Sequence, residues 1–155
     1  MCIRDSARYY PKGHRGVGGG RSHNYGVGLS RSESTRMLNS NLLVIPMIEE
    51  VEAVQNVDEI ASVEGVDILH VAPGDLTQSM GNASVEEVRN VMDEVIPKIK
   101  NSGKWPGVGG NSPADIDRIL DLIDLGANFV TVGANSILTK AAQDFRSQIT
   151  ERIVK

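Results

Sequence analysis

The sequence predicts an α/β fold built on a parallel sheet, because apolar runs alternate with amphipathic helical segments along residues 42–155. Each of four apolar runs is followed by a segment with helical spacing. Aromatic residues make up only 4% of the chain, so the core must consist mainly of Val, Ile and Leu, as is usual for parallel sheets. Four strand–helix units are half of an eight-stranded (β/α) barrel, which typically needs about 250 residues.

Residues 1–41 differ in character and predict a long loop preceding the barrel units, so we divide the chain into 1–41 and 42–155. The segment 13–36 is polar and rich in glycine and arginine, and no packed strand or long helix could use it. The alternative is a disordered segment with solvated charges. A nucleotide phosphate loop is disfavoured, because the glycines neither follow a clear strand nor open a helix. Residues 1–7 have no apolar periodicity and look non-native, and Cys2 is given no role.

Residues 42–81 predict a strand, a helix and a second strand with a carboxylate at the end of each strand. Leu42–Ile48 is a continuous apolar run that ends at Glu49. Val66–Ala72 is a second such run, which Pro73-Gly74 interrupts just before Asp75. Between the runs, one face of an amphipathic crossover helix carries Val51, Val54, Val57 and Ile60. Because both strands run in the same direction, Glu49 and Asp75 are expected at the same edge of the sheet.

This pair of carboxylates suggests a site for a hard divalent cation. Active sites of parallel α/β folds form at the carboxyl ends of the strands. Oxygen ligands without Cys suit Mg²⁺ or Mn²⁺. The turn also exposes the backbone amides of Gly74 and Asp75 to an anionic substrate. The alternative remains that Glu49 caps a helix or forms a salt bridge and that Asp75 is a helix N-cap.

The remaining elements follow from local signals. Ser84 and Glu87 have the spacing of a capping box, which begins a long helix ending at Ser102-Gly103. Trp105–Gly110 and Asn128–Val132 are the third and fourth strands. Ser112-Pro113 is expected to open a helix that buries Ile116, Ile119, Leu120 and Ile123. A last amphipathic helix runs from Ser136 to about Val154.

Two segments, IPMIEEVEAVQNVDEIASVEGVD and HVAPGDLTQSMG, resemble the HpcH/HpaI family of metal-dependent aldolases, which includes hydroxy-oxo-heptanedioate and dehydro-deoxyglucarate aldolases. The order Tyr10-Pro11-x-Gly13-x-Arg15-Gly16 resembles the loop after that family's fourth strand. The resemblance covers nearly all of 9–149 but only the carboxyl-terminal part of a family member. It implies the C-terminal half of a TIM (β/α)8 barrel of the phosphoenolpyruvate/pyruvate-domain type.

The resemblance also implies site residues. Glu49 and Asp75 would bind the metal, and the amides of Gly74 and Asp75 would hold the pyruvate carboxylate. Arg15 would lie in a loop that borders the active site, where it could face an anionic substrate. Met47 replaces the family's usual Gln, so a substrate contact is lost or replaced, and Ala72 replaces a Gly. The catalytic His base and the Arg that stabilises the enolate are expected in an amino-terminal half that this sequence lacks.

The implied activity is the reversible cleavage of a hydroxy-oxo-acid to pyruvate and an aldehyde through a metal-stabilised enolate, in a homo-oligomeric enzyme. No lysine lies at a strand end, which argues against a Schiff-base route. The three histidines, at positions 14, 23 and 70, lie outside the expected motif, and His70 is expected to be an inward or packed strand side chain. The alternatives are a citrate-lyase-like or phosphoenolpyruvate-using enzyme, and an inactive truncated barrel that acts only as an assembly partner.

Composition limits the function classes further. The formal charge of −4 gives no reason to expect a nucleic-acid partner. No run approaches the roughly twenty apolar residues of a membrane span. A single cysteine excludes an intrachain disulfide and favours a reducing, cytoplasmic location.

Overall fold

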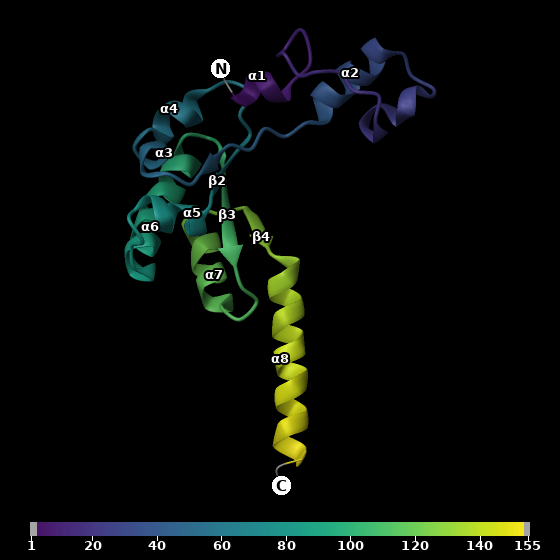
Figure 1. Cartoon of the computed structure of the whole chain (residues 1–155). Helices are drawn as coiled ribbons and strands as arrows, with labels where there is room; N and C mark the ends of the chain where they lie inside the picture. Colours follow the sequence, from purple (N-terminus) through teal and green to yellow (C-terminus); the bar gives the residue numbers. More distant parts are fainter. Residues whose placement is uncertain (1–2, 154–155) are drawn as a thin grey trace. The chain divides into compact units, whose positions relative to one another are not determined.

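A computed structural model describes residues 3–153 of the chain (Figure 1). The chain divides into two compact units. The first comprises Met1–Pro46 and Glu64–Asp67, and the second comprises Met47–Val63 and Ile68–Lys155. The second unit contains the sheet and is the larger of the two.

The first unit contains more helix than the sequence predicts. It consists of α1 (Ile3–Ala7), a 3-10 helix η1 (Arg21–Gly26) and α2 (Arg31–Asn41). The prediction of a loop through residue 41 is therefore wrong over α2. The missed signal is a capping box, in which the Ser30 hydroxyl accepts a bond from the Glu33 amide while the Glu33 carboxylate accepts one from the Ser30 amide. Because α2 has little apolar content, hydrophobic periodicity does not reveal it.

Buried polar contacts hold α2 in place. The Asn39 side chain accepts a hydrogen bond from the Tyr9 amide at 2.8 Å and donates one to the Tyr9 carbonyl at 2.9 Å. The His23 ring bridges the Ser34 hydroxyl at 2.8 Å and the Tyr9 hydroxyl at 3.2 Å. The buried Asn39 and His23 side chains are thus paired, as is usual for buried polar groups.

The second unit contains the predicted parallel sheet, with strand order β1-β2-β3-β4. Its strands are β1 (Met47–Ile48), β2 (Ile68–Val71), β3 (Trp105–Asn111) and β4 (Phe129–Val132). All neighbours pair in parallel. This half-barrel sheet confirms the predicted fold class.

The first strand is much shorter than the predicted run of residues 42–48. At Val44 the amide donates to the Asp67 carboxylate at 2.8 Å, and the Val44 carbonyl accepts from the Asp67 amide at 3.0 Å. Pro46 then has no amide hydrogen to donate. Before residue 47, one backbone bond and one side-chain bond to Asp67 thus stand in place of a continuous strand ladder.

The helices of the second unit largely follow the predicted order. They are α3 (Val51–Gln55), α4 (Val57–Ser62), α5 (Pro73–Ser79), α6 (Val85–Asn101), α7 (Ile116–Leu125) and α8 (Ala134–Ile153). The expected single crossover helix is interrupted at Asn56, whose side chain donates to the Glu52 carbonyl at 2.9 Å. The capping box of Ser84 and Glu87 is present at the start of α6.

The core lies between the sheet and the helices. Fully buried side chains of the strands and of helices α5 and α6 form it: Ile48, Ile68, Leu69, Val71, Val108, Leu76, Val95, Ile96 and Ile99. The opposite, inner face of the sheet carries Met47 and His70, both of which are partly accessible. The helices therefore pack mainly against the outer face of the sheet.

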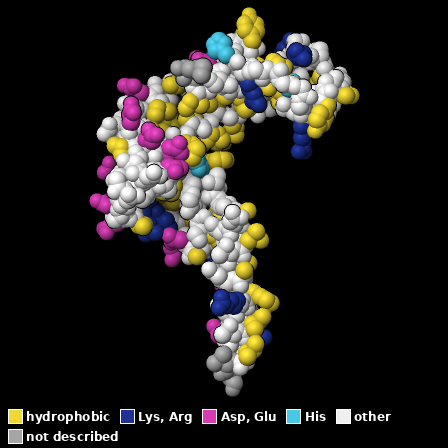
Figure 2. Space-filling view, in the orientation of Figure 1, with side chains coloured by type: hydrophobic (Ala, Val, Ile, Leu, Met, Phe, Trp, Pro, Cys, Tyr) yellow, Lys and Arg dark blue, Asp and Glu magenta, His cyan; other side chains and the backbone are white. Residues whose placement is uncertain are grey.

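The predicted burial of α7 is wrong in part. Leu122 is buried, whereas Ile116, Leu120 and Ile123 are exposed. The helix begins at Ile116 and not at Pro113, so the position of Pro113 does not predict which face of the helix is buried. Helix α8 extends away from the sheet (Figure 1), has no buried residue, and presents an apolar stripe (Figure 2). No helix within residues 3–153 is long and apolar enough to cross a membrane.

Candidate functional site

The structure brings Glu49 and Asp75 to one pocket at the carboxyl edge of the sheet. Glu49 directly follows β1, and Asp75 lies in the first turn of α5, directly after β2. Both side chains line a surface pocket of about 460 Å³ together with Glu50, Gln78 and Ser79. The pocket thus brings together two carboxylates that are 26 residues apart in the sequence.

Backbone hydrogen bonds fix the walls of this pocket. The Ala72 amide donates to the Ile48 carbonyl at 3.1 Å, which joins the ends of β1 and β2. The Val51 amide donates to the Ser79 hydroxyl at 3.0 Å, which joins the start of α3 to the end of α5. The two strand ends and the two short helices around the pocket are therefore linked by hydrogen bonds.

The structural alternatives for the two carboxylates are not found. Ala72 occupies the N-cap position of α5, and Glu50 occupies that of α3, in both cases without a side-chain capping bond. Within residues 3–153, neither Glu49 nor Asp75 makes an ion pair or a side-chain hydrogen bond. Two carboxylates that share a pocket without partners are suited to bind a cation.

The donor set fits a hard divalent cation that keeps several water or substrate ligands. Mg²⁺ is usually bound through one or two carboxylates, with water and substrate oxygens completing the octahedron. Among residues 3–153 no group of three or more His, Cys, Asp or Glu side chains could enclose a metal. The pair would therefore hold an open site and not a closed structural one.

The first turn of α5 supplies free amides beside the pair. Pro73 is the first helical residue, and the Leu76 amide is the first to donate within the turn, to the Ala72 carbonyl at 3.1 Å. The amides of Gly74 and Asp75 thus have no partner within the helix. Gly74 is exposed, and a side-chain carbon there would meet no atom within 4 Å. An oxygen anion has room to approach these amides.

The two other predicted substrate-binding residues, Met47 and Arg15, lie in different units of the chain. Met47 is the first residue of β1, on the inner face, and Glu49 follows the strand two residues later, where continued alternation would put it on the same face. Arg15 belongs to the first unit, where its guanidinium lies 5.0 Å from the centre of the Tyr9 ring and donates to the Ala7 carbonyl at 3.5 Å. A substrate role for Arg15 stays a prediction.

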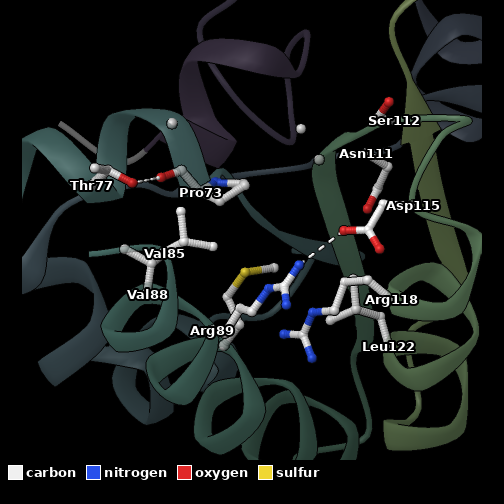
Figure 3. Close-up of a pocket in the computed structure, with 14 residues that line it drawn as sticks. Pro73, Thr77, Val85, Val88, Arg89, Asn111, Ser112, Asp115, Arg118 and Leu122 are labelled. Atoms are coloured by element: carbon white, nitrogen blue, oxygen red, sulfur yellow. Dashed lines mark hydrogen bonds and ion pairs between the residues drawn. The ribbon is translucent and has the colours of Figure 1, made fainter. Parts of the chain in front are cut away.

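A second pocket of about 280 Å³ lies between α5, α6, α7 and the end of β3 (Figure 3). Two arginines reach it, but Arg89 pairs with Asp115 at 2.9 Å and Arg118 pairs with Asp93 at 2.8 Å. Each positive charge is thus matched by a carboxylate. Sequence reasoning missed this pocket because it is formed by elements that only the tertiary fold brings together.

Comparison with known proteins gives one consistent family. A model of the HpcH/HpaI aldolase/citrate lyase family matches residues 3–142. A 2-keto-3-deoxy-L-rhamnonate aldolase of Shigella boydii serotype 4 (strain Sb227) is 33% identical over 155 residues, covering 93% of this chain and 54% of that protein. The Escherichia coli (strain K12 / DH10B) protein of that name is 34% identical with the same coverage. The chain spans about half the length of the curated relatives it matches.

Solved structures agree with this result. An HpcH/HpaI aldolase/citrate lyase family protein from Burkholderia cenocepacia J2315 superposes with a TM-score of 0.79 at 27% identity, covering 96% of this chain and 58% of that one. An HpcH/HpaI aldolase from Desulfitobacterium hafniense DCB-2 superposes with a TM-score of 0.72 at 25% identity, covering 93% and 56%. Both units of the chain are represented in these matches.

Proposed function

The chain belongs to the HpcH/HpaI aldolase/citrate lyase family, and from that premise we propose that it provides the metal and carboxylate sites of a class II aldolase. The reaction is the reversible cleavage of a hydroxy-oxo-acid to pyruvate and an aldehyde. The observation that carries the proposal is the meeting of Glu49 and Asp75 in one pocket at the strand ends, where neither has a side-chain partner in the described part of the chain. The name of the rhamnonate aldolase relatives supports a sugar-derived acid as substrate.

Four residues in and beside the pocket have tasks in this proposal. Glu49 and Asp75 would hold Mg²⁺ or Mn²⁺, which would supply Lewis-acid stabilisation of negative charge on the oxo-acid. The amides of Gly74 and Asp75 bind the substrate carboxylate through the positive end of α5. Met47 contributes an apolar wall on the inner face. The general base and the enolate-stabilising Arg are proposed to come from residues outside this sequence.

Metal binding by the chain itself tests the proposal. Titration calorimetry with Mn²⁺ and Mg²⁺, in the presence and absence of oxalate as a pyruvate-enolate mimic, should show binding that oxalate tightens. The double variant Glu49→Gln, Asp75→Asn should lose both effects. The variant Glu52→Gln, Asp58→Asn makes the same charge change on α3 and α4 outside the pocket and should behave as wild type. Absence of binding by a wild-type chain with a folded circular dichroism spectrum would refute the proposal.

A citrate-lyase-like reaction is the second candidate, since the family description includes citrate lyase. The two reactions share a metal and an enolate, so the pocket supports both equally. An activity assay separates them. An aldolase releases an aldehyde from a hydroxy-oxo-acid, whereas a citrate-lyase-like enzyme acts on citrate-like acids. In either case we propose a homo-oligomer, supported by the exposed apolar side chains of α7 and α8, and a cytoplasmic location, supported by the single cysteine.

A further inference from the structure

His70 lies on the inner face of β2 with its ring directed along the neighbouring strand. In the register of the sheet, Met47, His70 and Gly107 are paired. A side-chain carbon built on Gly107 would lie 2.7 Å from His70 Nδ1, and one on Gly109 would lie 2.7 Å from Nε2. Gly109 is two residues closer to the carboxyl edge. The imidazole therefore lies against two glycines of β3 with Nε2 directed toward that edge.

The Nε2 atom reaches the level of Glu49, one of the two carboxylates. Ile48, Val71 and Val108 are paired across β1, β2 and β3, so the next residues, Glu49, Ala72 and Gly109, form the next level. Strand alternation puts Glu49 on the same face as Met47 and His70. Since neighbouring strands are about 4.8 Å apart, β1 and β3 are separated by about 10 Å.

The surroundings of the ring determine which nitrogen carries the proton. Nδ1 is buried and has no hydrogen-bond partner among residues 3–153, and the ring makes a T-shaped contact with Phe129 with centroids 5.8 Å apart. Burial lowers the pKa of His70, so the ring is neutral near pH 7. A buried N–H without an acceptor is rarer than a buried acceptor without a donor. The proton is therefore placed on Nε2, which becomes a hydrogen-bond donor.

We propose that His70 is a substrate-contacting residue whose Nε2–H donates a hydrogen bond to an oxygen of the oxo-acid bound beside Glu49 and Asp75. This inference rests on the proposed function. Met47, the neighbour of His70 on β1, has no donor to offer. On β4, the Thr131 hydroxyl already points to the Val108 carbonyl at 3.5 Å. His70 thus supplies a neutral donor on the inner face at the level where the substrate would bind.

Three variants test the contact. His70→Phe keeps an aromatic ring but removes the donor, His70→Gln keeps an N–H near the position of Nε2, and Gly109→Ala displaces the ring. Oxalate affinity is measured by calorimetry at saturating Mn²⁺, and Mn²⁺ affinity is measured without oxalate. The Phe and Ala variants should bind oxalate about tenfold more weakly with unchanged Mn²⁺ affinity, as expected for one lost hydrogen bond. The Gln variant should recover most of the loss.

The outcomes separate this proposal from the proposed function. Failure of the wild-type chain to bind Mn²⁺ refutes the aldolase site, and with it the contact. Normal wild-type binding with unchanged oxalate affinity in His70→Phe overturns the contact alone. Equal losses in the Phe and Gln variants also overturn it, since packing and not donation would then be responsible. Nitrogen-15 NMR of the imidazole gives a metal-independent check, because a proton on Nδ1 at pH 7 contradicts the assigned donor.

Discussion

Asn111 is expected to control the attachment of β4 to the rest of the sheet. The β3–β4 register shifts between Val108 and Asn111, so the backbone ladder is interrupted there. The side-chain nitrogen of Asn111, Nδ2, donates to the Val108 carbonyl at 3.0 Å and to the Thr131 carbonyl at 3.0 Å. Since both partners are acceptors, the orientation of the amide group is unambiguous. This buried side chain replaces the ladder bonds lost at the irregularity.

The variant Asn111→Ala should lower the free energy of unfolding by about 1–3 kcal/mol, because it removes two hydrogen bonds that contribute about 0.5–1.5 kcal/mol each. With a urea dependence of about 2 kcal/mol per molar, a loss of about 2 kcal/mol moves the midpoint down by about 1 M. β4 pairs with β3 alone, so amide exchange in β4 should accelerate more than exchange in β2.

Urea unfolding followed by circular dichroism, with amide exchange on the same samples, measures both effects. Asn90→Ala is the matched control, since Asn90 is exposed on α6 and its replacement should change stability by less than about 0.5 kcal/mol. An Asn111→Ala midpoint within error of wild type, together with unchanged exchange in β4, would refute the reasoning.

Three further predictions concern the helices. Hydrogen bonds from Ser84 lower the pKa of Glu87 below the usual value of 4.5. The capping box therefore stabilises the fold above pH 4.5, and this contribution is lost as the pH falls through the lower folded pKa. In Ser84→Ala, the pKa of Glu87 measured by NMR should rise toward 4.5. Ile96→Ala should cost about 2–5 kcal/mol in urea unfolding, because this side chain is fully buried. Leu138→Lys with Phe145→Lys should weaken self-association in sedimentation experiments without a change in circular dichroism.

Features that depend on neighbouring residues in the chain could be predicted well. The capping box of Ser84 and Glu87, the apolar runs around β2 and β4, and the position of a carboxylate after each of two strands all follow from local pattern. The capping box of Ser30 carries the same kind of signal and was available, but the glycine-rich surroundings obscured it.

The sequence alone therefore determined the fold class, the order of the elements and the two strand ends at which chemistry is expected. Tertiary structure decided which face of α7 is buried, where β1 begins, and that Glu49 and Asp75 line one pocket. It also placed the His70 ring against two glycines of another strand. The physical reason is that periodicity reports only which side of an element is apolar, whereas register, side-chain pairing and the packing partner depend on residues far away in the chain.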